Sequence, residues 1–186
     1  DVGPDAPDKP LRYPPAGEEV LGRPMKVALV FMNQGPNVSR GVGYVAAMIQ
    51  RAGHQLAFYD TWTASLPEVR RRIASGDSDV LLVSTVSLLF PRALELIRGV
   101  TEERPMPVLV GGPHAVSYGA RVLQDNPEVD YVCVGEGEGM VADFLEALPT
   151  RRLESVPNLA HRTRDEVVTN PTAPPRDLAD LPEATA

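Results

Sequence analysis

The chain has 186 residues, of which 43% are hydrophobic, and it carries a formal net charge of -7 with a pI of about 5.0. This length allows one domain with a substantial core and some additional chain. The acidic balance argues against nucleic acid as a partner, because binding to a phosphate backbone requires clustered Lys and Arg. No apolar run approaches the roughly 20 residues that cross a bilayer, and the polar start does not resemble a signal peptide. We therefore expect a cytoplasmic protein without a nucleic-acid or membrane partner.

A single cysteine, Cys133, limits the chemistry of this chain. It excludes a disulfide framework, a cysteine zinc site and a cysteine-ligated iron–sulfur cluster built from this chain alone. Because Cys133 lies within an apolar run, we expect a buried and unreactive thiol.

Residues 1–24 contain six prolines and few apolar side chains, which predicts an extended or disordered leader. From Met25 onward, apolar runs predict five strands, and a helical pattern follows each of them. The strands are expected over 26–32, 55–59, 79–86, 108–110 and 129–134, and the helices over 41–52, from Ser65, from Phe90, over 115–124 and over 140–148. We place Gly53 as the left-handed residue that ends the first helix, and Ser65 as the cap of the second.

Strict alternation of strand and helix predicts an α/β fold with a parallel sheet and helices on both faces. The lengths and alternation of the predicted strands and helices suit a flavodoxin-like (Rossmann-like) five-stranded sheet of order 2-1-3-4-5. A small C-terminal β-hairpin is expected over 158–169, followed by a proline-rich linker. The predicted organisation is therefore a leader (1–24), an α/β domain (25–150), and a hairpin with a linker (151–186).

Open parallel sheets bind ligands beyond the carboxyl ends of their strands. At that edge Val108–Val110 is followed directly by Gly111 and Gly112, which have no Cβ that would stand between the strand and a ligand. An ordinary strand-to-helix turn explains this glycine pair equally well when the pair is considered alone.

The other loops at this edge are also unusual. The loop over 33–40 offers amides and backbone donors but lacks carboxylates and histidine. The sequence also contains no GxGxxG or Walker pattern, which disfavours a nucleotide held mainly by its phosphates. Ser84, Thr85 and Ser87 place small hydroxyls after the third strand, either for a ligand or as a helix-capping turn. Glu136 lies in a glycine-rich loop, where it either contacts a ligand or favours the dipole of the next helix.

The three histidines are His54, His114 and His161. His54 and His161 are expected at the surface. His114 follows the glycine pair and faces the predicted ligand edge, where contact with a ligand and a purely structural role are equally plausible.

Four segments together resemble the cobalamin-binding domain of cobalamin-dependent radical S-adenosylmethionine enzymes, over about residues 25–182. They are Gly-Pro-Asn (35–37), Ser-Thr-Val-Ser (84–87), Val-Gly-Gly-Pro-His (110–114), and Val-Asp-Tyr-Val-Cys-Val-Gly-Glu-Gly-Glu (129–138). The resemblance implies that the nucleotide tail of cobalamin enters between the sheet and its helices, and that the corrin ring lies over the carboxyl edge. The implied cofactor-binding residues are Gly35, Pro36, Asn37, Val38, Ser39, Ser84, Thr85, Val86, Ser87, Gly111, Gly112, Pro113, His114, Gly135, Glu136 and Gly137, with no catalytic residue and no protein ligand to cobalt.

The sequence departs from related cobalamin domains in two respects. Methionine-synthase-like domains carry Asp-x-His-x-x-Gly after the first strand, whereas residues 33–38 contain no histidine, so we expect cobalamin in a base-off, His-off form. The radical module needs three cysteines in CxxxCxxC, so S-adenosylmethionine and a [4Fe-4S] cluster would belong to a module outside this chain. The expected role is to present cobalamin to a radical catalytic module, in the same parent chain or separate, for methyl transfer or cyclisation at an unactivated carbon.

Two alternatives share this fold. A receiver-like signalling or interaction module uses acidic residues after the first and third strands, where this chain has Asn33 and Ser84. A flavin or nucleotide carrier is the other, since flavodoxin-like sheets accept many ligands.

Overall fold

The computed structural model describes residues 23–36, 39–163, 166–174, 177, 179 and 181–183. Its seven-stranded sheet has the order β2-β1-β3-β4-β5-β6-β7. The strands are β1 (Lys26–Phe31), β2 (Gln55–Asp60), β3 (Val80–Ser84), β4 (Val108–Gly111), β5 (Tyr131–Cys133), β6 (Leu159–Arg162) and β7 (Val167–Thr169). The first five are parallel in the predicted order, and the hairpin continues the same sheet because β6 pairs antiparallel with β5.

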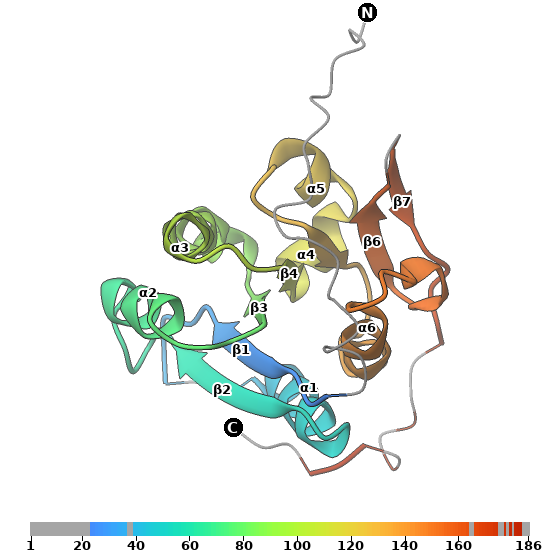
Figure 1. Cartoon of the computed structure of the whole chain (residues 1–186), viewed down its shortest axis with the longest axis horizontal. Coiled ribbons are helices and arrows are strands. Elements are labelled where there is room, and N and C mark those ends of the chain that lie inside the picture. Colours follow the sequence, from blue (N-terminus) through green and yellow to red (C-terminus); the bar gives the residue numbers. More distant parts are fainter. Residues whose placement is uncertain are drawn as a thin grey trace, which may run out of the picture.

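Helices cover both faces of the sheet (Figure 1). The α-helices are α1 (Arg40–Arg51), α2 (Leu66–Ala74), α3 (Phe90–Glu103), α4 (Pro113–Tyr118), α5 (Arg121–Asp125) and α6 (Val141–Ala147), and the short 3₁₀ segments are η2 (Ser87–Leu89) and η3 (Leu153–Ser155). Buried residues of α1 and α6 pack on one face, and those of α2, α3, α4 and α5 pack on the other. The α/β three-layer class predicted from the alternation is confirmed.

Alternation along the central strands divides the apolar residues between two cores. In β3, Leu81 and Val83 face the α2–α3 side, whereas Val80 and Leu82 face the α1–α6 side. All four are at most 2% exposed, as expected for a strand that is covered on both faces. A single strand therefore contributes to both cores, and its last residue reaches the carboxyl edge.

The predicted helix over 115–124 is two helices in the structure. Gly119 has φ +56°, a left-handed conformation that ends α4, and α5 begins two residues later. Gly53 also has positive φ, at +84°, and ends the first helix as predicted. Ser65 occupies the N-cap of α2, but its side chain makes no capping hydrogen bond.

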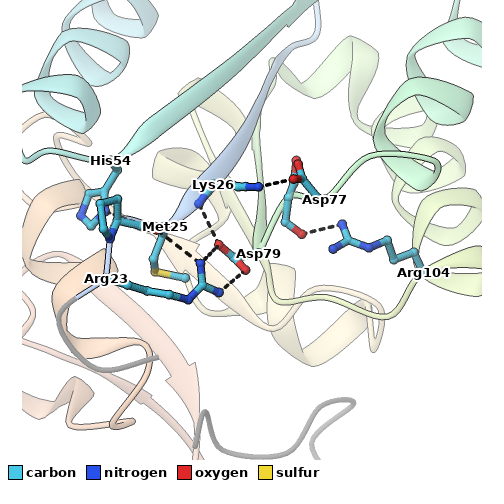
Figure 2. A network of polar contacts seen from close by, with 9 residues as sticks. Arg23, Met25, Lys26, His54, Asp77, Asp79 and Arg104 are labelled. Atoms are coloured by element: carbon cyan, nitrogen blue, oxygen red, sulfur yellow. Dashed lines mark hydrogen bonds and ion pairs between the residues drawn. The ribbon is translucent and has the colours of Figure 1, made fainter. Parts of the chain in front are cut away.

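At the amino edge of the sheet, Asp79 joins the start of β1 to β3 (Figure 2). Its carboxylate accepts a hydrogen bond of 2.8 Å from the Lys26 backbone N–H and two bonds from the Arg23 guanidinium, at 2.6 and 3.1 Å. The hydrogen bond to Asp79 raises the pKa of Arg23. Lys26 also pairs with Asp77, whose pKa it lowers. This network, Arg23–Lys26–Asp77–Asp79, fixes the chain where it enters the sheet.

His161 was expected at the surface, and that prediction is wrong. It lies in β6 between Tyr131 of β5 and Val168 of β7, so only 5% of it is exposed. His54 is half-buried, and its Nδ1 accepts a hydrogen bond of 3.1 Å from the Met25 N–H. Desolvation by burial lowers the pKa of His54. The predicted leader up to residue 22 lies outside the described residues, as do residues 164, 165, 175, 176, 178, 180 and 184–186 of the predicted hairpin and linker.

Candidate functional site

A cavity of about 520 Å³ opens at the carboxyl edge of the sheet, on the face covered by α1 and α6. It exists because the last side chain of each of three neighbouring strands on this face is small. Ser84 ends β3 and lies in register with Gly111, the last residue of β4. Cys133 ends β5, and a Cβ placed on Gly111 would lie 3.6 Å from the Cys133 Cβ. We call Ser84, Gly111 and Cys133 the small-residue row.

Apolar side chains enclose the space above this row. Two residues before Ser84 and Gly111, on the same face of the sheet, lie Leu82 and Leu109, and Leu29 of β1 is in register with Leu82. These three leucines form the floor, and each is at most 5% exposed. The walls come from the starts of the two covering helices. They are Val42 and Val45 of α1, Val141 of α6, and Met140, the N-cap of α6. Because α1 and α6 both begin at the carboxyl edge, the cavity lies between the sheet and the starts of two helices.

The two glycines after β4 have different surroundings. Gly112 has φ +86°, and a Cβ there would lie 2.8 Å from the Ser84 Oγ and 2.9 Å from the Thr85 backbone N. The turn therefore requires glycine at this position. Gly111 has no such obstacle, since the contact of its added Cβ with Cys133 would be an ordinary one. A side chain at Gly111 would instead occupy the cavity that this residue lines.

Few polar groups face the cavity. The Ser84 hydroxyl has no hydrogen bond with any other residue that the structure describes. The Ser39 hydroxyl caps α1, accepting a bond of 3.4 Å from the Val42 N–H. The Cys133 thiol donates to the Gly135 carbonyl oxygen at 3.3 Å, and burial raises the pKa of this thiol to about 11. Cys133 is therefore a neutral thiol near pH 7, as the sequence predicted.

The loop between β5 and α6 forms one side of the cavity mouth. Gly135, Glu136 and Gly137 line the mouth, and Glu136 is exposed. A Cβ on Gly135 would lie 2.7 Å from the side chain of Asn158, which donates a hydrogen bond of 3.3 Å from Nδ2 to the Glu136 carbonyl oxygen. Buried Asn158, with φ +58°, thus connects this loop to the start of the hairpin.

Eight of the sixteen residues predicted to bind a cofactor line the cavity. They are Ser39, Ser84, Gly111, Gly112, Pro113, Gly135, Glu136 and Gly137. Gly35 and Pro36 are not among the lining residues. The Gly35 N–H instead donates to Asn33 Oδ1 at 3.1 Å in a local turn. Asn37 and Val38 lie outside the described residues.

The rest of the β3–α3 loop lies beside the cavity rather than within it. Thr85 is 1% exposed, and its hydroxyl donates to the Val86 carbonyl oxygen at 3.0 Å. Ser87 Oγ lies 3.0 Å from His114 Nδ1. The predicted hydroxyl cluster therefore serves the loop itself, except at Ser84.

His114 packs between two aromatic rings rather than lining the cavity. Its ring stacks on Phe90 at a centroid distance of 3.8 Å and on Tyr118 at 4.5 Å, and only 6% of the residue is exposed. Desolvation by burial lowers its pKa, which keeps the ring neutral. Of the two roles considered for His114, this geometry favours the structural one, in which it joins α4 to η2.

Exposed apolar side chains lie near the cavity mouth. Val86 and Leu88 follow β3 and are 38% and 74% exposed, and Val116 and Tyr118 of α4 are each 53% exposed. The Ser87–His114 contact joins the two elements that carry them. These two adjoining elements therefore carry four exposed apolar side chains.

Sequence reasoning missed the residues that enclose the cavity. It named the loops but not the floor leucines, the wall residues of α1 and α6, or Val116 and Ser117 of α4. Period-2 alternation in the strands could have identified Leu29, Leu82 and Leu109 as residues of one face. Which helices cover that face follows only from the assembled fold.

The fold is a flavodoxin-like α/β domain with a cavity between its sheet and two helices. Residues 28–145 match the family model for the B12 binding domain, and the chain belongs to this family. Among the described residues, no helix is long and apolar enough to span a membrane, and no group of three or more His, Cys, Asp or Glu side chains is placed to hold a metal ion.

Two curated relatives are each 28% identical to this chain. One is the hopanoid C-3 methylase of Methylococcus capsulatus, matched over 144 residues and 75% of this chain. The other is the anaerobic magnesium-protoporphyrin IX monomethyl ester cyclase of Rubrivivax gelatinosus, matched over 153 residues and 77% of this chain. The match covers 27% of each relative, so the chain spans about a quarter of their length.

Solved structures of the radical S-adenosylmethionine methyltransferase TsrM from Kitasatospora setae share the fold. The structure with cobalamin and a [4Fe-4S] cluster aligns with a TM-score of 0.69 and 16% identity, over 88% of this chain and 32% of that one. The structure with tryptophan and an S-adenosylmethionine analogue gives the same TM-score and identity, over 79% and 30%.

Proposed function

We propose that this domain binds cobalamin in a base-off, His-off form and presents it to a radical S-adenosylmethionine catalytic module. The nucleotide tail would enter the cavity, and the corrin ring would lie over the carboxyl edge. The cavity above the small-residue row carries this proposal, because it lies within the matched B12-binding region. The 28% identical methylase and cyclase support a parent enzyme of methyltransferase or cyclase type.

The residues present fit such a tail. A cavity of about 520 Å³ falls within the range of small-molecule sites, roughly 300–1,000 Å³. Gly111 leaves open the volume that any side chain at its position would fill, although the neighbouring Cys133 does not require glycine there. Leaving this volume open serves a ligand rather than the packing of the domain itself.

The positions of the histidines support the His-off form. Of the described residues, none that lines the cavity is a histidine. His54 accepts a hydrogen bond from Met25 at the opposite edge, His114 is stacked between two rings, and His161 is buried in β6. The loop over 33–40 contributes no imidazole either, since its sequence contains no histidine.

Cobalamin, when bound, supplies the organometallic chemistry, and the protein supplies binding and orientation. The floor leucines and helix walls would exclude water from the tail, and Ser84 would offer one hydrogen bond. Asn37, Val38 and Ser39 are proposed to lie under the corrin, with the exposed apolar residues Val86 and Leu88 at its margin.

The proposal is tested by mixing the chain with hydroxocobalamin and following retained colour through gel filtration, with an absorption spectrum of the protein fraction. We expect stoichiometric retention and a base-off spectrum. A graded series, Gly111→Ala, Gly111→Val and Gly111→Leu, should bind progressively less cobalamin. Circular dichroism of each variant should match that of the parent chain.

Two results would overturn the proposal. One is no retention at micromolar concentrations, and the other is a Gly111→Leu variant that binds as well as the parent. Flavin mononucleotide serves as the matched control ligand, and retention of flavin in place of cobalamin would favour the flavin-carrier alternative.

A further inference from the structure

We propose that the cavity selects among corrinoids by their lower base, accepting apolar benzimidazole-type bases and disfavouring purines such as adenine. This inference rests on the proposed function, since it assumes that the nucleotide tail enters the cavity. The conclusion follows from the hydrogen-bonding groups that the cavity lacks.

The floor of the cavity offers hydrocarbon side chains only. Leu29, Leu82 and Leu109 on the floor are at most 5% exposed, and their strands are paired on both sides. The backbone N–H and C=O groups beneath the tail are therefore engaged in the sheet. The walls are valines and a methionine from α1 and α6.

Two side chains of the small-residue row can interact with a base by hydrogen bonding. The Ser84 hydroxyl has no partner among the described residues and can satisfy one nitrogen. The Cys133 thiol already donates to the Gly135 carbonyl oxygen and stays protonated near pH 7, and its sulfur is a weak acceptor.

The stronger acceptors lie at the mouth. Glu136 is exposed and Glu138 is half-buried, and both belong to the loop that precedes α6, outside the strands. Ser117 is also exposed, and its hydroxyl donates to the Pro113 carbonyl oxygen. These groups can meet the ribose, the phosphate ester or corrin amides, but the floor below them is leucine.

The two kinds of base differ in what they require. A benzimidazole released from cobalt has one ring nitrogen to satisfy, which matches the single hydroxyl of Ser84. Adenine adds an exocyclic amine with two N–H donors and further ring acceptors. Burying such a group without a partner costs about 1–3 kcal/mol, and a factor of ten in affinity corresponds to 1.4 kcal/mol. We therefore expect cobalamin to bind at least about fivefold more tightly than its adenine analogue.

The test measures the dissociation constants of cobalamin, pseudocobalamin (adenine base) and cobinamide (no base) with the full chain, by absorbance titration or calorimetry. The expected order of affinity is cobalamin first, with both other corrinoids at least about fivefold weaker. Equal affinity for cobalamin and pseudocobalamin, both tighter than cobinamide, would overturn the selectivity while leaving the proposed function intact. Equal affinity for all three would overturn the placement of the tail, and no binding of cobalamin would overturn the proposed function itself.

Two variants test the cause of the selectivity. Cys133→Ser introduces a hydroxyl in the small-residue row, and Val45→Thr introduces one on the half-buried wall of α1. Each should narrow the cobalamin-to-pseudocobalamin ratio severalfold, whereas the matched Cys133→Ala and Val45→Ala variants should not. Val45 is half-buried, so its variants should fold even if a buried serine at position 133 is not tolerated. An unchanged ratio in folded Val45→Thr and Cys133→Ser proteins would contradict the inference.

Discussion

Gly111 and Gly112 are adjacent in the chain but meet different surroundings. Gly112 has a left-handed backbone and packs against the β3–α3 loop, whereas Gly111 ends a regular strand beside open space. Substitution of Gly112 should therefore disturb folding, and substitution of Gly111 should disturb ligand binding. The sequence showed both glycines but could not distinguish these roles, because φ and the neighbouring loop are properties of the assembled structure.

Gly112→Ala should lower the free energy of unfolding by about 2–4 kcal/mol, because the new Cβ meets Ser84 Oγ at 2.8 Å and the backbone remains at positive φ. Gly111→Ala should change it by less than about 1 kcal/mol. Urea denaturation of both variants measures the difference. Equal stability of the two alanine variants would show that the loop contact is not a constraint.

The Cys133 thiol should make stability depend on pH in the alkaline range. Burial raises its pKa from an ordinary value of 9.0 to about 11, so the folded state favours the protonated thiol. Its contribution is complete below pH 9 and is lost as the pH rises toward 11, amounting to about 2–3 kcal/mol at 1.36 kcal/mol per pH unit. Compared with Cys133→Ala, the parent chain should therefore lose more stability between pH 8 and 11. Parallel denaturation curves for the two proteins across that range would contradict this.

At the scale of elements, the β5–α6 loop is held from outside the parallel sheet. Asn158, just before β6, donates to the Glu136 carbonyl oxygen and accepts from the Ala173 N–H at 3.1 Å. The hairpin thereby positions one side of the cavity mouth. This role was not visible in the sequence, where 158–169 read only as a small hairpin of its own.

Asn158→Ala should destabilise the chain by about 2–4 kcal/mol, because two partly buried hydrogen bonds are lost and alanine is less suited to φ +58°. It should also weaken cobalamin binding severalfold by releasing the loop. Asn170→Ala is the matched control, since Asn170 is a buried asparagine that bonds Leu153 and Val156 away from the cavity. If both variants weaken cobalamin binding equally at matched stability, Asn158 does not act by positioning the β5–α6 loop.

Element types were predictable because apolar runs and helical periodicity are local signals. The five parallel strands and their order follow from these signals together with the topology rules for α/β folds. Two features were not local. Gly119 divides a helix that periodicity predicted as continuous, and the burial of His161 depends on pairing with β5 and β7. The site was predictable as a set of loops but not as a cavity, because its floor and walls are ordinary core residues.

At the scale of the whole molecule, the cavity leaves apolar surface of the core uncovered until a ligand occupies it. Cobalamin at 100 times its dissociation constant should therefore raise the free energy of unfolding by about 2.7 kcal/mol, and the melting temperature by roughly 5–10 °C. Thermal unfolding by circular dichroism with and without hydroxocobalamin measures this shift. Gly111→Leu should show no shift, and an equal shift in this variant would place the ligand elsewhere.

The salt-bridge network at the amino edge has a practical consequence for handling the molecule. The Asp77 side chain is 76% exposed, and its pair with Lys26 lies at the opposite end of the strands from the cavity. An Asp77→Cys substitution would lose one exposed ion pair, and such pairs contribute little to stability. The native Cys133 is 3% exposed and protonated, so the introduced thiol would be the one that a maleimide dye or a biosensor chip captures. The protein would then be oriented with its cavity toward the solution.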